Sequence, residues 1–215
     1  MKKGVEYIGT VTKTDFPNKG QVDCKEDGTA SVKGVLPGQK VRFVVSKKRA
    51  GKPVGRLLEV MEKSSLEDVE PKCPHFEECG GCAYQTMSYK NQSDLKKNMI
   101  KNILDNAVKG DYDFEGILDS PVEWRYRNKM EFSFGDEFKD GPLALGMHKV
   151  NSFHDIVTVD SCKIVDEDYT KVLRCVLEHC AKKELPFYHK LRHDGYLRHL
   201  LVRRTTKTNQ MLVGI

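Results

Sequence analysis

Hydrophobic and polar residues alternate in short runs through the first 60 residues of the chain. The runs cover residues 5–11, 21–24, 29–36, 41–45 and 55–61. Alternation with a period of two is typical of strands that bury one face. Pro37-Gly38 and Ala50-Gly51 mark tight turns between runs. About five short strands in so short a segment predict a closed or partly closed β-barrel of the OB type.

The pattern changes in the second part of the chain. Residues 88–108 carry apolar residues at helical spacing and predict an amphipathic helix that Ser88 caps. Alternation returns at residues 126–134, and a second amphipathic helix is predicted from Asp166 onward. Residues 196–215 predict a hairpin. The second helix has one apolar stripe, so we expect it to pack on a sheet.

An acidic segment separates the two patterns. Residues 62–70 hold four acidic residues and one lysine, which is the composition of an exposed linker. We therefore predict a barrel at residues 1–61, a linker at 62–71 and a second domain at 72–215. The 215-residue length is compatible with two domains, since compact domains usually have roughly 100–200 residues. The last predicted strand reaches Ile215, and we expect this sequence to be a piece of a longer protein.

The positive charge is concentrated near the N-terminus. Residues 1–60 have a formal balance of +7, and the rest of the chain has −2. A small basic domain indicates a polyanion as partner. The cations Lys47, Lys48, Arg49 and Arg56 cluster around one predicted hairpin and are candidates for contact with nucleic-acid phosphates. A hairpin that is merely well solvated explains them equally well.

Two kinds of segment are missing from the sequence as given. No run approaches the ~18 apolar residues of a membrane-spanning helix, and the first residues lack the apolar core of a secretory signal. We therefore expect a cytoplasmic, monomeric protein without a membrane partner. In that reducing compartment, seven cysteines are better explained as metal ligands and core thiols than as disulfides.

Three cysteines share one short loop. Cys73, Cys79 and Cys82 form a C-x5-C-x2-C array that contains the pair Gly80-Gly81. Thiolates gathered in this way select zinc or an iron–sulfur cluster over hard cations. The wide first gap favours the cluster, and the glycines would let backbone N–H groups approach its sulfides. Structural zinc remains open, whereas a thioredoxin-like pair lacks the βαβ context that it requires.

A site with four thiolates needs one more ligand. Cys180 lies on the apolar stripe of the second helix, Cys175 lies beside that stripe, and Cys24 lies in the basic barrel across the linker. Cys162 lies in a predicted loop between a strand and a helix, where it is freest to reach a metal. We therefore predict Cys162 as the fourth ligand, and expect the shared site to link the cysteine loop to the sheet during folding.

Several segments together resemble one enzyme family. They are VKGVLPGQKVRFVV, CPHFEECGGCAYQ, YRNKMEFSF, the DSC that contains Cys162, and YLRHLLVRR. In this order they resemble the bacterial ribosomal-RNA uracil-5-methyltransferases that carry an N-terminal TRAM domain and a [4Fe–4S] cluster. The cysteine loop followed by Gln85 is the most specific of these segments.

The resemblance implies a fold and a chemistry. It implies an OB-like TRAM barrel, then an α+β central domain that holds the cluster through Cys73, Cys79, Cys82 and Cys162, with the C-terminal Rossmann-like methyltransferase domain absent from this sequence. In the family, that last domain binds S-adenosylmethionine, and its cysteine attacks C6 of a flipped uracil. No glycine-rich cofactor loop and no nucleophile context occur here, so we expect neither catalytic nor S-adenosylmethionine-binding residues, and an inactive piece.

RNA is the partner that the resemblance implies, and ribosomal RNA is favoured over transfer RNA. Further cations that we predict to contact RNA phosphates are Arg125, Arg127, Lys129, Arg203 and Arg204. The cluster is expected to be structural, because this methyl transfer requires no electron. The alternative is a stand-alone RNA-binding module that zinc holds together, without enzymatic activity. A radical-SAM enzyme is disfavoured, since it needs a C-x3-C-x2-C loop.

Overall fold

The computed structural model describes all 215 residues, which form two compact units. The barrel unit consists of Met1–Glu70 and Thr86–Asp119. The sheet unit consists of Pro71–Gln85 and Ser120–Ile215. Each unit therefore contains two separate segments of the chain, and the cysteine loop belongs to the sheet unit.

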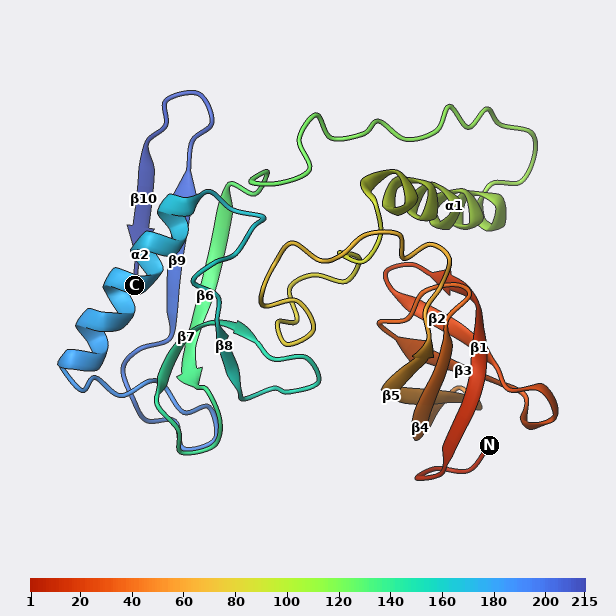
Figure 1. Cartoon of the computed structure of the whole chain (residues 1–215), viewed down its shortest axis with the longest axis horizontal. Coiled ribbons are helices and arrows are strands. Elements are labelled where there is room, and N and C mark those ends of the chain that lie inside the picture. Colours follow the sequence, from red (N-terminus) through yellow and green to blue (C-terminus); the bar gives the residue numbers. More distant parts are fainter. The chain divides into compact units, whose positions relative to one another are not determined.

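Five strands form a closed barrel in the first unit (Figure 1). They are β1 (Glu6–Asp15), β2 (Lys19–Asp23), β3 (Thr29–Lys33), β4 (Lys40–Arg49) and β5 (Lys52–Glu62), with a 3-10 turn at Lys25–Asp27. The order around the barrel is β1-β2-β3-β5-β4, and β1 pairs with β4 to close it. All pairs are antiparallel except β3 with β5.

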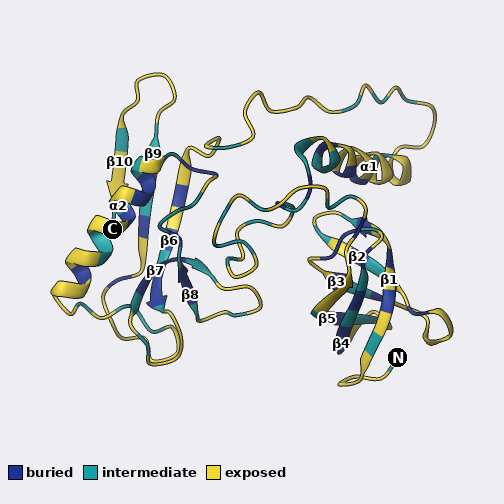
Figure 2. Cartoon of the chain, in the orientation of Figure 1, coloured by how far each residue is buried: buried dark blue, intermediate teal, exposed yellow.

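Alternate residues of these strands fill the barrel interior (Figure 2). Val22, Val32, Val41 and Phe43 are completely buried, as expected for the inward positions of alternating strands. The ring of Phe43 occupies the space beside Gly55, where a Cβ would lie 2.3 Å from Phe43 Cδ2. Any larger residue at that position would therefore displace the ring from the core.

Helix α1 (Tyr89–Ala107) completes the barrel unit. The Ser88 hydroxyl accepts a hydrogen bond from the Asn91 N–H and caps the first turn, as the sequence predicts. The Ser88 N–H in turn donates to Asp68 Oδ1 at 2.6 Å, and Asn91 Nδ2 donates to the carbonyl of Leu66 at 3.2 Å. These bonds fix the start of α1 to the segment that follows β5.

The second unit is built on one antiparallel sheet of order β10-β9-β6-β7-β8 (Figure 1). Its strands are β6 (Lys129–Asp136), β7 (Leu143–His148), β8 (Ile156–Thr158), β9 (His199–Arg204) and β10 (Met211–Gly214). Helix α2 (Glu167–Lys182) packs on it through Tyr169, Leu173 and Cys180, which share a core with Phe132 and Leu200. The apolar stripe predicted for the second helix is confirmed.

The fold class predicted from the sequence is wrong. It placed an OB-like TRAM barrel first and then a separate α+β domain with an iron–sulfur loop. The structure consists of two sheets and two α-helices. The two units alternate along the chain: the cysteine loop belongs to the unit of the second sheet, whereas α1, which follows it in the sequence, belongs to the barrel unit. The bonds of Ser88 and Asn91 to Asp68 and Leu66 hold the start of α1 to the barrel unit, and sequence periodicity does not reveal such bonds.

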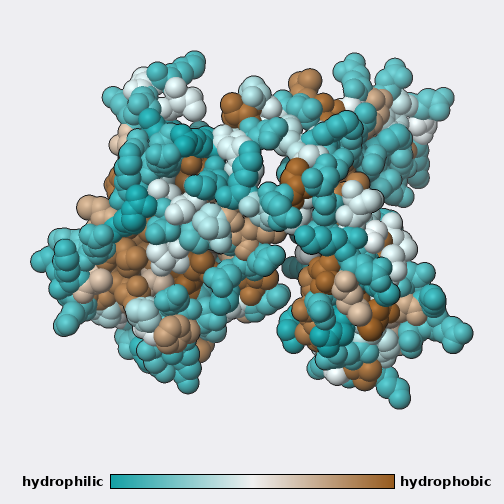
Figure 3. Space-filling view, in the orientation of Figure 1, coloured by the Kyte–Doolittle hydropathy of each residue, from teal (hydrophilic) through white to brown (hydrophobic).

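Hydrophilic residues cover most of the visible face in the space-filling view (Figure 3). Neither helix combines the length and the apolar character that crossing a bilayer demands.

A first prediction concerns the cap of α2. The Asp166 carboxylate accepts a hydrogen bond from the Asp168 N–H at 3.1 Å, which lowers the pKa of Asp166, and the Arg204 guanidinium lowers it further. We expect Asp166→Ala to reduce the free energy of unfolding by about 1 kcal/mol, the usual value of an N-cap. Because the folded-state pKa is lowered, this difference is present at neutral pH and disappears as the pH falls through the carboxylate range. Urea unfolding at pH 7 and pH 3 measures it.

Candidate functional site

The cysteine loop is fixed to the end of strand β7. The Gly80 N–H donates to the carbonyl of His148 at 3.0 Å, and the Val150 N–H donates to the carbonyl of Glu78 at 2.7 Å. Cys79 also forms an antiparallel bridge with Lys149. A Cβ on Gly80 would lie 3.0 Å from the His148 carbonyl oxygen, so glycine permits this close approach of the two backbones.

His75 of the cysteine loop contacts the loop of Cys162. Its Nε2 lies 3.3 Å from both the Ser161 N–H, from which it accepts a hydrogen bond when neutral, and Asp160 Oδ1, to which it donates when protonated. On the other side, the Arg127 N–H donates to the carbonyl of Ile164 at 3.0 Å and holds the Cys162 loop to the segment before β6. His75 is a residue that the sequence analysis missed, although it lies only two positions after Cys73.

The four predicted ligand cysteines line one small cavity, with a volume of about 30 Å³. Cys73, Cys79, Cys82 and Cys162 are all partly buried and free of disulfides. The structure does not arrange three or more His, Cys, Asp or Glu side chains closely enough to hold a metal ion. The chain thus brings the four thiols to one place without forming a coordination shell, and the ligand set stays a prediction.

Burial dominates the acid–base behaviour of Cys79. It is the largest of the effects that raise the pKa of this thiol to about 11, and the neighbouring thiols Cys82, Cys162 and Cys73 contribute smaller rises to that value. The Gly81 N–H, which donates to Cys79 Sγ at 3.4 Å, acts in the opposite direction. Since a metal binds the thiolate, any metal must displace a proton here, and its affinity must fall as the pH is lowered.

Hydrogen-bond donors lie beside two of the other three thiols, Cys82 and Cys162. Burial raises the pKa of Cys82, and a hydrogen bond from Gln85 and the charge of Arg127 oppose that rise. Burial also raises the pKa of Cys162, against the N–H groups of Ile164 and Val165. Donors of this kind around thiolate sulfurs are typical of iron–sulfur sites, where they compensate the negative charge. The donor set and the cavity therefore fit a cluster.

The remaining cysteines lie elsewhere. Cys24 packs in the barrel core, Cys180 packs in the sheet-unit core, and Cys175 is exposed on α2. Burial, followed by the charges of Asp27 and Asp23, raises the pKa of Cys24 to about 11. None of the three lines the four-thiol cavity.

The β4–β5 hairpin presents unpaired cations. Lys47, Lys48, Arg49 and Arg56 are exposed, and none makes an ion pair. Ala50 and Gly51 both adopt positive φ (48° and 76°) and make the tight turn that pairs Arg49 with Lys52. The hairpin therefore holds several cations at one edge of the barrel.

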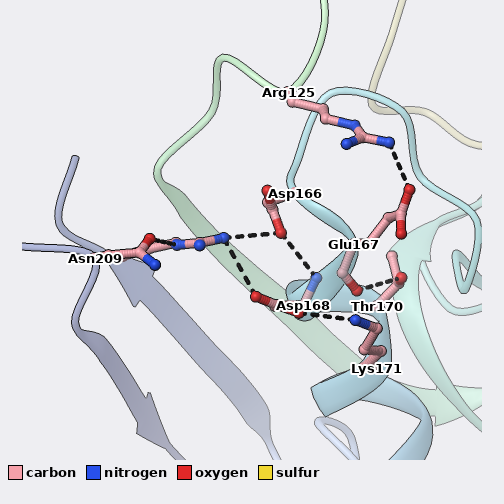
Figure 4. A network of polar contacts seen from close by, with 8 residues as sticks. Arg125, Asp166, Glu167, Asp168, Thr170, Lys171 and Asn209 are labelled. Carbon is pink, nitrogen blue, oxygen red and sulfur yellow. Dashed lines mark hydrogen bonds and ion pairs between the residues drawn. The ribbon is translucent and has the colours of Figure 1, made fainter.

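The predicted cations of the sheet unit differ in how far they are already paired with carboxylates, and Figure 4 shows the pair of Arg125 with Glu167. Arg125 pairs with Glu167 at the start of α2, and Arg204 Nη1 lies 2.8 Å from Asp166 Oδ1 and 3.4 Å from Asp168 Oδ2. Lys129 pairs with Glu131 at 3.4 Å, Arg127 Nε donates to the carbonyl of Lys129, and Arg203 is exposed without an ion pair.

A polar groove follows the β9–β10 turn. Its lining includes Lys129, Arg203, Arg204, Thr205, Lys207 and Gln210, and it contains no carboxylate. Lys129 and Arg203 are directly cross-strand partners. Lys207 belongs to this groove although the sequence analysis did not select it, because a single lysine in a turn gives no pattern.

Curated sequence relatives match the chain along its length. A protein of Caldanaerobacter subterraneus subsp. tengcongensis is 42% identical over all 215 residues, and one of Clostridium tetani is 39% identical over the same length. A third, of Halalkalibacterium halodurans, is 33% identical over 94% of the chain. All three sequence relatives carry the name uncharacterized RNA methyltransferase. The chain spans about half the length of each, at 44–47%. No protein-family model matches the chain.

A solved structure has a similar fold. The Pyrococcus abyssi tRNA (uracil-54, C5)-methyltransferase, crystallised with S-adenosyl-L-homocysteine, matches 96% of the chain with a TM-score of 0.68 and 20% identity, and 44% of its own length is covered. The match includes both units. The chain therefore has the fold of part of one methyltransferase, in place of the fold class predicted from the sequence.

Proposed function

We propose that this chain is the RNA-binding and [4Fe–4S]-binding part of an S-adenosylmethionine-dependent RNA (uracil-C5)-methyltransferase. The relatives named RNA methyltransferases support the reaction, and the fold likeness to a uracil-C5 enzyme supports the position of methylation. Binding of S-adenosylmethionine is proposed for the whole protein and is not assigned to residues of this chain.

The observation that carries the cluster is the meeting of four cysteines, which are up to 89 residues apart, in one cavity of the sheet unit. Cysteines that serve only as core residues have no reason to gather at one cavity, and the other three cysteines of the chain do not line it. Cys73, Cys79, Cys82 and Cys162 would hold the iron as thiolates. The cluster would supply a covalent link between the cysteine loop and the loop after β8, and so stabilise the unit.

The experiment is a metal analysis of protein purified without oxygen. We expect about four irons and about as many acid-labile sulfides per chain, with a brown colour. One zinc per chain and no colour would support the zinc-stapled RNA-binding module and contradict the cluster.

RNA contacts are proposed for two surfaces, the β4–β5 hairpin and the groove at the β9–β10 turn. Lys47, Lys48, Arg49, Arg56 and Arg203 support this best, since they have no carboxylate partner that a phosphate would have to replace. Contacts by Arg125 and Arg204 would require the loss of ion pairs with α2. The proposed substrate is ribosomal RNA, on the basis of the family resemblance; transfer RNA is the alternative.

A prediction tests the hairpin. Replacing Lys47, Lys48 and Arg49 by alanine should weaken RNA binding and reduce the slope of log affinity against log salt by about two units, or about 0.7 per lost phosphate contact. Fluorescence anisotropy with a single-stranded RNA measures the slope. The control replaces Lys96, Lys97 and Lys109, which are exposed and change the net charge equally. Equal slopes for the two triple variants would make the hairpin a solvated surface only.

The substrate is tested with the full-length protein. It should transfer labelled methyl groups from S-adenosylmethionine to C5 of uridine in ribosomal RNA transcripts and leave transfer RNA unlabelled. Label in transfer RNA alone would correct the substrate, and no label in either RNA would contradict the proposed reaction.

A further inference from the structure

Gln85 is a buried polar residue to which the proposed chemistry gives no role. The residue is only 8% exposed and lines the same cavity as the four thiols. It ends the first segment of the sheet unit, immediately before the chain enters the barrel unit. Burying an amide costs free energy unless both of its ends find partners, so its surroundings indicate what it does.

Both ends of the Gln85 amide have partners, and both partners are predicted cluster ligands. Gln85 Oε1 accepts a hydrogen bond from the Cys73 N–H at 3.2 Å. The side chain also hydrogen-bonds with the Cys82 thiol. This hydrogen bond lowers the pKa of Cys82 and so stabilises the thiolate, which means that Gln85 donates through its amide nitrogen, the only donor of its side chain. One side chain thus connects the first and the third cysteine of the loop.

This arrangement differs from the donors at the other thiols. Cys79 and Cys162 receive backbone N–H groups from residues two or three positions further along the chain. Such donors follow from the local turn, and no substitution of a side chain removes them. The donor to Cys82 belongs to a side chain, so its effect on the sulfur can be changed without altering the backbone.

We propose that Gln85 is a positioning residue, which sets the distance between Cys73 and Cys82 and donates a hydrogen bond to the Cys82 thiolate of the loaded cluster. This inference rests on the proposed function, because it assumes that the four thiols bind iron. A donor to a ligand sulfur stabilises the more negative, reduced cluster and therefore raises its reduction potential. Loss of this hydrogen bond also leaves the Cys82 ligand less well fixed, and removal of a residue that hydrogen-bonds to a metal ligand typically lowers metal affinity by about 10–100-fold.

Two substitutions separate positioning from charge. Gln85→Glu keeps the size of the side chain and an oxygen for the Cys73 N–H, but places a carboxylate oxygen against the Cys82 sulfur. Gln85→Leu removes both hydrogen bonds and leaves an apolar side chain of similar volume. The matched control is Gln92→Glu on α1, where the amide donates to the carbonyl of Met87 in the barrel unit.

The experiment loads wild-type protein and the three variants with iron and sulfide under argon. It records the reduction potential by EPR-monitored titration and the rate of iron loss to a chelator. We expect both Gln85 variants to have a more negative potential, Glu more so than Leu, and to lose iron about tenfold faster. Gln92→Glu should match the wild type. If Gln85 had a merely structural role, its substitution would change the rate of iron loss, but the reduction potential would not become more negative in Gln85→Glu than in Gln85→Leu.

Different results overturn different statements. If the wild type holds iron and both Gln85 variants share its potential and its rate of iron loss, the role of Gln85 is wrong while the cluster stands. If the wild type takes up no iron, the cluster is wrong and the inference fails with it. Circular dichroism spectra confirm folding, and Gln85→Glu, which retains the contact with Cys73, keeps the test available if Gln85→Leu is unstable.

Discussion

Cys79→Ser and Cys162→Ser should each contain at least about tenfold less iron than the wild type after anaerobic loading, and both should be colourless. The two residues are 83 positions apart, yet both line the cavity. A serine hydroxyl is a poor replacement for a thiolate, which is the soft ligand that iron–sulfur clusters require. Iron and sulfide assays together with the visible absorption spectrum measure the loss.

Two other cysteines provide the controls for these substitutions. Cys175→Ser changes an exposed residue of α2 and should leave both iron content and stability unaltered. Cys180→Ser places a hydroxyl in the core and should lower stability, but it should retain the iron. Similar iron contents in all four variants would show that the ligands lie elsewhere in the chain.

The sequence predicted individual elements better than their arrangement. The helix from Tyr89 begins next to its predicted cap Ser88, and the helix from Glu167 begins next to Asp166, where its start was predicted from the hydrophobic spacing. The grouping of α1 with the barrel depends on hydrogen bonds to Leu66 and Asp68. These bonds join residues 20 or more positions apart, and no periodicity encodes them.

The candidate site shows the same limit. The spacing of Cys73, Cys79 and Cys82 is visible in the sequence, and the structure places Cys162 at the same cavity. Neither His75 nor Gln85 was selected as a site residue, although Gln85 belongs to the most specific segment of the family resemblance, because a histidine or a glutamine fits many environments. Their roles depend on the partners that the fold brings to them, namely Ser161 and Cys73.

Phe132→Ala should have the largest effect on folding, with a loss of about 3–5 kcal/mol in the free energy of unfolding. Phe132 is completely buried in the core between the central strand β6 and helix α2. Removal of its ring leaves a cavity in a closely packed interior. Phe153→Ala is the control, since that ring is 87% exposed and its loss should change stability by less than about 0.5 kcal/mol. Urea unfolding of the iron-free proteins measures both.

The same variant also tests whether the site and the core are one energetic unit. Met130 and Val159 belong to the core that contains Phe132 and also line the four-thiol cavity. A ligand that binds only the folded state stabilises it, so iron loading should restore part of the stability that Phe132→Ala loses. Urea midpoints with and without reconstitution provide this comparison. If loading raises the midpoint of neither the wild type nor the variant, the proposed cluster does not contribute to the stability of the sheet unit.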